Sequence, residues 1–153
     1  MSTFVSLGNN KKQFLRLLEF VKKNENFLPK PIYLQKGHTI FFRKGYKIFK
    51  FLNMDKFKEM MCRSKIIIIH GGAGSIINSL NYNKKPIVMA RLKKYDEHIN
   101  DHQLGLVKFL SSKKKIFIAN DKLNIKKVLN KKNEKKDSNS YEELKKTILK
   151  YVK

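Results

Sequence analysis

The sequence predicts an α/β domain built on a parallel sheet that is flanked by helices. Short apolar segments of strand length alternate with longer segments whose apolar residues recur at helical spacing, which is typical of this fold class. Segment 65–69 is apolar without polar alternation, as in a strand that is covered on both faces. Turns rich in glycine or asparagine follow two of the predicted strands, where the chain must turn into a helix.

The first strand is expected at 3–7, an uninterrupted run that ends at the turn Gly8-Asn9-Asn10. A helix follows from about Lys12, because the residues after it place apolar side chains on one face and two lysines near the end. This apolar face consists of Phe14, Leu15, Leu17, Leu18 and Val21.

The next expected elements are two strands and a helix. Prolines bound a loop at 29–31, and the segment 32–35 after it is a short strand. Segment 46–52 alternates apolar residues with lysine, which suits a further strand. Asp55 is placed to cap a helix that runs to about Met61.

The second half of the chain repeats this alternation. The strand at 65–69 leads into a glycine loop at 70–75 and a helix that extends through Leu80. The remaining elements are expected as a strand at 86–90, a helix at 101–110, a strand at 116–119 and a helix at 122–129.

We divide the chain into one domain at 1–130, a polar linker at 131–140 and an amphipathic helix at 141–153. Leu144, Ile148 and Val152 share one face of that helix. The helix is a candidate docking element for a partner, and packing on its own domain is the alternative.

The composition indicates a globular, cytoplasmic chain. Apolar residues make up 41% of the 153 residues, and no apolar run reaches the length of about 18 residues that a membrane-spanning helix needs. The N-terminus has no basic segment ahead of its apolar one, so we expect no signal peptide. Cys62 is the single cysteine, which argues against a disulfide framework or a thiolate metal cluster, and we expect it to be a small core residue.

The net charge of +23 predicts attraction to an anionic partner. Phosphates, an acidic membrane surface and nucleic acid all fit that charge. A nucleic-acid-binding module is the least favoured of these, because the lysines are scattered and no RNP, KH or zinc-finger motif occurs.

The loop after the most apolar strand is a candidate ligand site. Doubly wound sheets bind ligands beyond the carboxyl ends of their strands, and glycines let backbone N–H groups approach a diphosphate at the start of the next helix. Ser75 either donates to the phosphate or caps the helix, and a tight structural turn is the alternative reading of the whole loop. The loop matches neither the lysine-containing triphosphate motif nor the standard dinucleotide motif. Its residues are His70, Gly71, Gly72, Ala73, Gly74 and Ser75.

A second group of polar residues follows the next strand and therefore emerges at the same edge of the sheet. Arg91 suits a phosphate or a carboxylate. Glu97, Asp101 and Gln103 suit the hydroxyl groups of a sugar, which need both donors and acceptors. Capping of a helix by Asn100 or Asp101 is the structural alternative.

The histidines are candidates for chemistry. His98 and His102 are four residues apart, but the motif H-E-x-x-H is absent and no third ligand is evident, so we expect no metal site. His70 and His98 are candidate catalytic bases, although a histidine at the end of a strand is as often a structural hydrogen-bonding group.

These residues in this order resemble the C-terminal domain of family 28 glycosyltransferases. The chain is most similar to single-domain subunits of two-component transferases. One type is the bacterial exopolysaccharide β-1,4-galactosyltransferase subunit, and another is the eukaryotic catalytic subunit that adds the second N-acetylglucosamine to a dolichol-linked precursor. The resemblance covers about residues 3–120. It is carried by Val5–Asn9, Phe14, Leu17-Leu18, His70–Ile77, Lys85–Val88, Arg91, Glu97-His98 and Asp101-His102-Gln103.

The resemblance implies one half of a GT-B enzyme, a Rossmann-like parallel sheet that carries the nucleotide sugar and faces a cleft. It implies that 71–75 meets the diphosphate and that Asp101 and Gln103 meet the sugar, while Gly8 and Asn9 line the cleft.

Asn78 stands where the family often has a glutamate associated with the ribose, and asparagine keeps the hydrogen-bonding capacity without the charge. The family generally balances the diphosphate charge with helix dipoles and side chains, and the sequence has no Asp-x-Asp motif. We therefore expect no divalent ion and no cofactor besides the UDP-sugar donor.

The function implied is that of a hexosyltransferase subunit that uses UDP-galactose, UDP-glucose or UDP-N-acetylglucosamine to extend a lipid-linked acceptor in exopolysaccharide, capsule or lipid-linked oligosaccharide synthesis. The length suffices for one such domain, so we expect a membrane-anchored partner subunit that binds the acceptor and holds the chain at the inner face of the membrane. Four or five lysines at an anionic leaflet contribute only about 4–5 kcal/mol, so charge assists this placement. A non-catalytic accessory subunit is the alternative function.

Overall fold

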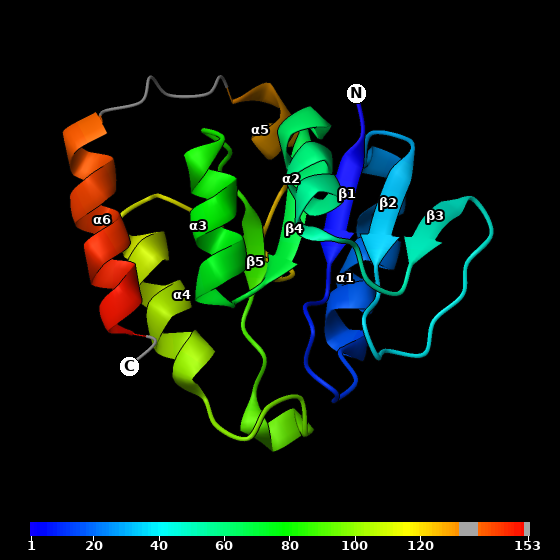
Figure 1. Ribbon diagram of the computed structural model, residues 1–153. Helices are drawn as coiled ribbons and strands as arrows, with labels where there is room; N and C mark the ends of the chain where they lie inside the picture. The colour runs from blue at the N-terminus through cyan, green and yellow to red at the C-terminus, as the bar shows by residue number, and fades with distance from the viewer. Residues whose placement is uncertain (132–137, 152–153) are drawn as a thin grey trace.

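The computed structural model describes residues 1–131 and 138–151 and shows a six-stranded parallel sheet with helices on both faces, which confirms the predicted fold class (Figure 1). The strands are β1 (Thr3–Ser6), β2 (Ile32–Gln35), β3 (Tyr46–Phe49), β4 (Ile66–His70), β5 (Ile87–Met89) and β6 (Phe117–Ile118). The helices are α1 (Leu15–Asn24), α2 (Met54–Arg63), α3 (Ala73–Asn81), α4 (His102–Ser112), α5 (Ile125–Asn130) and α6 (Ser138–Lys150), with 3-10 turns η1 (Glu25–Phe27) and η2 (Lys93–Tyr95).

The strand order in the sheet is β3-β2-β1-β4-β5-β6, and every neighbouring pair is parallel. In the middle of the sheet, Val5 of β1 lies between Leu34 of β2 and Ile68 of β4. From β1 to β3, successive strands are added towards one edge of the sheet, and from β4 to β6 they are added towards the opposite edge. The loops that follow β1 and β4 therefore lie side by side at the carboxyl edge, which is where doubly wound sheets bind ligands.

The sheet separates two apolar clusters. Alternate side chains of β4 enter different clusters: Ile66 and Ile68 pack with α1 and α5, whereas Ile67 and Ile69 pack with α2, α3, α4 and α6. Because both faces of β4 are covered, the strand has no polar position along its buried length, and its unbroken apolar sequence follows from that.

Helix α1 begins at Leu15, three residues later than expected. The preceding backbone is used in turn and loop contacts instead of helical ones: the amide of Lys12 donates to Asn10 Oδ1 at 2.9 Å, and the amide of Phe14 donates to Thr39 Oγ1 at 3.2 Å. These contacts hold the segment after β1 across the carboxyl edge of the sheet.

Two expectations for α2 are wrong. The cap is Asn53, whose side-chain oxygen accepts from the amide of Lys56 at 2.8 Å, and Asp55 lies inside the first turn. Cys62 is exposed, because the buried face of α2 is formed by Phe57 and by the two methionines just before the cysteine. A position one residue beyond the buried face of a helix points towards solvent.

Helix α6 packs on its own domain. Ile148 is 1% exposed and belongs to the same cluster as α3 and α4, and the Tyr151 ring stacks on Phe109 at 5.7 Å. Residues 132–137 of the predicted linker, and Val152, lie outside the described residues. None of the described helices combines the length and the apolar character that crossing a membrane requires.

Candidate functional site

The candidate site lies at the carboxyl edge of the sheet, where the loops after β1, β4 and β5 meet. His70 is the last residue of β4 and points its ring between the backbones of Gly8 and Gly72. A β-carbon built on Gly8 would lie 2.7 Å from the His70 ring, and one on Gly72 would lie 2.3 Å from His70 Nε2. Gly8 also has φ +78°, a conformation that glycine adopts without strain. The two glycines are therefore required by the fit of this ring.

His70 is held neutral at ordinary pH. Burial lowers the pKa of its imidazole to about 4, the positive charges of Arg91 and His98 act in the same direction, and the backbone of Ser6 acts in the opposite one. Among the described residues no hydrogen-bond partner reaches the buried Nδ1 of His70. A general base works best when its pKa is close to the operating pH, so His70 is a weak base in this environment.

The start of α3 is open to a ligand. Gly72 is the N-cap, and within the described part of the chain no side chain caps this end of the helix. The first N–H groups of a helix lack helical partners, and together with the helix dipole they form an anion-binding site. Apart from its chain neighbours and the backbone of its own helix, no heavy atom of the described residues lies within 4 Å of the position that a β-carbon on Gly74 would occupy. Ser75 follows in the same turn and is partly accessible.

Gly71 has a different role from Gly74. A β-carbon on Gly71 would lie 3.0 Å from both Gln103 Cβ and Val107 Cγ2, so this glycine allows β4 and α4 to approach closely. The Oε1 of Gln103 also accepts from the amide of Arg91 at 3.0 Å. The structure thus brings Gln103 next to the glycine loop, as the sequence order predicts.

Arg91 has a structural role. Its side chain is 1% exposed, and its guanidinium donates to the carbonyl oxygens of Leu7 at 2.7 Å, Lys12 at 3.0 Å and Glu97 at 3.1 Å. Burial lowers its pKa to about 10, partly offset by Glu97, so the group remains charged at neutral pH. The prediction that Arg91 contacts a phosphate is therefore wrong for this arrangement. The buried guanidinium instead joins the loop after β1 to the loop after β5.

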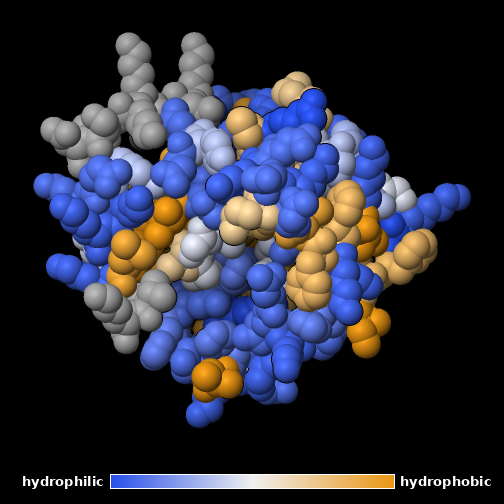
Figure 2. Space-filling model, in the orientation of Figure 1, coloured by the Kyte–Doolittle hydropathy of each residue, from blue (hydrophilic) through white to orange (hydrophobic). Residues whose placement is uncertain are grey.

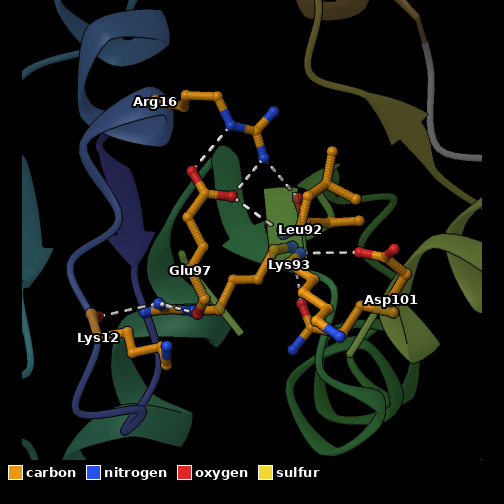
Figure 3. A network of polar contacts seen from close by, with 9 residues as sticks. Lys12, Arg16, Leu92, Lys93, Glu97 and Asp101 are labelled. Atoms are coloured by element: carbon orange, nitrogen blue, oxygen red, sulfur yellow. Dashed lines mark hydrogen bonds and ion pairs between the residues drawn. The ribbon is translucent and has the colours of Figure 1, made fainter. Parts of the chain in front are cut away.

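Glu97 is likewise turned inward. Its carboxylate receives two hydrogen bonds from Arg16, at 2.6 and 2.8 Å, and one from the amide of Leu92 at 3.0 Å (Figure 3). Arg16 also donates to the carbonyl of Ala90 at 2.8 Å. Contrary to the sequence prediction, Glu97 therefore does not point to a sugar. It positions the loop after β5 through its contacts with Arg16 and Leu92. Arg16 was missed by sequence reasoning, and the available signal was its rarity, since the chain has few arginines among many lysines.

The rest of the loop after β5 is fixed by local contacts. Asp101 Oδ1 accepts from the amide of Lys93 at 2.8 Å, so this carboxylate braces the loop and makes no capping bond to α4 (Figure 3). Asn100 Oδ1 accepts from the amide of His102 at 3.2 Å, and His98 Nδ1 accepts from the amide of Asn100 at 3.3 Å. A further ion pair joins Lys12 to Asp96 across the two loops.

Two asparagines complete the predicted set. Asn9 is exposed and its Oδ1 accepts from Gln35 Nε2 at 3.4 Å, which joins the loop after β1 to the end of β2. Asn78 is partly accessible and lies one turn beyond Gly74 on α3, so the two residues share a face of that helix. Within the ranges 1–131 and 138–151, no three His, Cys, Asp or Glu residues are grouped to hold a metal ion. The absence of a divalent ion from the reaction stays a prediction.

A doubly wound parallel sheet with a glycine loop and an uncapped helix at its switch point defines the chain as a nucleotide-binding type of α/β domain. Comparison with known families matches residues 6–152 to the glycosyltransferase family 28 C-terminal domain, and the chain belongs to this family. It is therefore a glycosyltransferase domain with a nucleotide-sugar-binding function. Comparison with curated proteins gives no match.

Proposed function

We propose that the chain is the donor-binding half of a hexosyltransferase and that it holds a UDP-sugar at the start of α3. The observation that carries this proposal is the uncapped helix start at Gly72–Gly74: in the described part of the chain, no side chain lies within 4 Å of a β-carbon built on Gly74 other than those of its chain neighbours. The oxygens of a diphosphate bound there would accept hydrogen bonds from the backbone N–H groups at the start of α3. The Ser75 hydroxyl lies within the same turn. In this proposal Asn78, one turn further on the same face, binds the ribose. Asp101 and Gln103 bind the sugar through the atoms that remain free beside their contacts with Lys93 and Arg91.

The chemistry follows from this placement. An acceptor hydroxyl attacks the anomeric carbon of the sugar, the bond from that carbon to the diphosphate oxygen breaks, and UDP leaves with the bonding electron pair. Negative charge develops on the diphosphate as the bond breaks. The N–H groups and the dipole of α3 stabilise that charge because they are aligned before the reaction starts.

The acceptor side belongs to a partner in this proposal. His70 is buried with a lowered pKa, which leaves His98 as the remaining candidate base on this chain. We propose that a membrane-associated partner subunit supplies the base or the environment that activates His98, and presents a lipid-linked acceptor. UDP-galactose, UDP-glucose and UDP-N-acetylglucosamine are the donors to distinguish.

Calorimetric titration of the purified chain with UDP and with these three UDP-sugars tests the donor site. Gly74→Asp is expected to abolish binding, because it adds a carboxylate where the diphosphate lies without creating a clash inside the fold. Asn26→Asp is the matched control, since it adds the same charge to an exposed residue in η1, at the opposite edge of the sheet. Equal binding by both variants and the native chain would contradict the proposed placement, and failure of every nucleotide to bind would contradict the donor site itself.

A non-catalytic accessory subunit is the second candidate function. It is favoured by one observation, the commitment of Arg91 and Glu97 to contacts within the fold. Transfer assays with the reconstituted complex separate the two functions. Gln103→Ala is expected to reduce transfer at least tenfold if this chain holds the reacting sugar, and to leave transfer unchanged if the chain is accessory.

A further inference from the structure

The segment between Glu25 and Asp55 has an unusual charge distribution. It contains six basic residues and no carboxylate. It also carries five of the large apolar side chains that are exposed on the surface, of which Phe27 lies in η1 and the other four lie after β2. We define the basic apolar patch as Ile40, Phe42, Phe51 and Met54 together with the exposed lysines Lys44, Lys47 and Lys50.

The loop between β2 and β3 presents two of these apolar side chains in a fixed arrangement. Ile40 is 82% exposed and Phe42 is 86% exposed, whereas Phe41 between them packs on the core and lies 6.0 Å from the Tyr46 ring. Gln13 holds the start of this loop, because its Nε2 donates to the carbonyl of His38 at 3.0 Å and its Oε1 accepts from the amide of Ile40 at 2.8 Å. The outward direction of both side chains is therefore built into the fold.

The connection between β3 and α2 lies against this loop and contributes Phe51 and Met54. The His38 ring packs edge-on against Phe51 at 5.1 Å, and the amide of Gly37 donates to the carbonyl of Lys50 at 2.9 Å. Figure 2 shows hydrophobic side chains among hydrophilic ones on the side of the molecule where β2 and β3 lie in Figure 1. The two segments thus form one surface.

The basic apolar patch adjoins the candidate site. A β-carbon on Gly37 would lie only 2.4 Å from the carbonyl oxygen of Gly8, so the loop that starts the patch touches the loop that borders the His70 ring. Both loops follow strands at the carboxyl edge of the sheet. A surface that covers the patch would therefore lie next to the loop after β1 that borders the candidate site.

We propose that the basic apolar patch docks directly onto an anionic lipid surface. Large apolar side chains that enter the boundary between headgroups and acyl chains, next to lysines that attract acidic headgroups, are the features of an interfacial membrane contact. Each lysine near such a surface increases partitioning about fivefold, and each large apolar side chain that leaves water adds about tenfold or more. The apolar side chains would add the affinity for the membrane that the attraction of the lysines to acidic headgroups is too weak to provide.

A lipid surface fits the patch better than nucleic acid does. Ile40 and Met54 have no ring to stack on a base, and Arg43, the one arginine in this segment, is paired with Glu25 at 2.6 Å. The inference depends on the proposed function in one respect only: membrane docking would bring the donor site next to a lipid-linked acceptor.

Vesicle co-flotation of the full chain tests the inference without any nucleotide. We expect binding to vesicles of phosphatidylcholine with phosphatidylglycerol, and at least tenfold weaker binding to phosphatidylcholine alone. The double variant Ile40→Ser/Phe42→Ser is expected to lose about tenfold or more of the binding to the anionic vesicles. Leu149→Ser is the apolar control, because it removes an exposed leucine of α6 outside the patch.

Charge reversal separates the patch from the overall charge of the chain. Lys44→Glu/Lys47→Glu is expected to weaken vesicle binding by at least tenfold, and Lys146→Glu/Lys150→Glu on α6, with the same change in net charge, by clearly less. Equal effects of the two pairs would overturn the inference, as would wild-type binding by the Ile40/Phe42 variant. Tighter binding to a single-stranded RNA than to vesicles would overturn it in favour of nucleic acid. Because the Ile40/Phe42 variant should bind UDP-sugars like the native chain, loss of vesicle binding and loss of the donor site are measured separately.

Discussion

Each of the four arginines donates to a partner within the chain. Arg16 pairs with Glu97, Arg43 with Glu25 and Arg63 with Glu59, while Arg91 holds three carbonyl oxygens. A planar guanidinium with five donors can join several acceptors at once, which the point charge of a lysine does less well. In a chain whose charge is carried mainly by lysine, Arg16, Arg43 and Arg91 cross-link distant parts of the fold, whereas Arg63 pairs with Glu59 within α2.

His70 gives a pH-dependent contribution to stability whose sign follows from its environment. Its pKa is about 4 in the folded chain and about 6.5 when exposed, so folding favours the neutral ring. The contribution is therefore fully present above about pH 6.5 and is lost as the pH falls towards 4, to a limit of about 3 kcal/mol.

We expect the free energy of unfolding of the native chain to fall more steeply than that of His70→Gln between neutral pH and about pH 4. The difference between the two chains reports His70 alone, because the other titrating groups are common to both. Urea denaturation at a series of pH values measures it. Parallel pH profiles would show that the ring is not held neutral by burial.

At the scale of elements, the loops of the candidate site are fixed to one another by polar contacts between distant parts of the chain. The loop after β1 is joined to the loop after β5 by Arg91 and by the Lys12–Asp96 pair, and α1 is joined to the same loop by Arg16. Preorganised groups of this kind keep ligand contacts in place before the ligand arrives.

Helix α6 contributes to the core through a single face, and adjacent residues test this. We expect Ile148→Ala to lower the free energy of unfolding by about 2–4 kcal/mol, because it leaves a cavity between α6, α3 and α4. Leu149→Ala, at a position that is 46% exposed, is expected to cost less than about 1 kcal/mol. Urea denaturation of both variants measures the two values. Similar small losses would show that α6 is not docked on the domain in solution.

At the scale of the whole molecule, the net charge of +23 opposes the compact state through repulsion between lysines. Salt screens exposed charges that are separated by more than the Debye length, which is about 10 Å at 0.1 M. Pairs such as Lys23–Asp121 lose attraction in salt as well, but basic side chains greatly outnumber carboxylates.

We therefore expect the midpoint of thermal unfolding to rise as sodium chloride is raised from low to moderate concentration. A variant with Lys44→Gln, Lys146→Gln and Lys150→Gln should show a smaller rise, because three exposed positive charges are removed. Scanning calorimetry of the two chains at matched pH makes the comparison. A midpoint that falls with salt would mean that the ion pairs outweigh the repulsion.

The order of strands and helices and the parallel sheet could be predicted from the sequence, because apolar periodicity and turn residues act over a few neighbouring positions. The unbroken apolar run of β4 and the glycine loop after it indicated the carboxyl edge of the sheet as the place of the candidate site. The boundaries were less predictable: α1 starts late because Phe14 and Lys12 use their amides in contacts outside the helix, one of them with Thr39 in another loop.

The sequence by itself thus determined the fold class, the family resemblance and the edge of the sheet where the candidate site lies. Only the tertiary structure decided what each side chain does there. Arg91 holds Leu7, 84 positions away, and Arg16 holds Glu97, 81 positions away. Such contacts depend on how distant segments pack in three dimensions, so a local pattern can supply a suitable residue type but leaves the direction of its side chain undetermined.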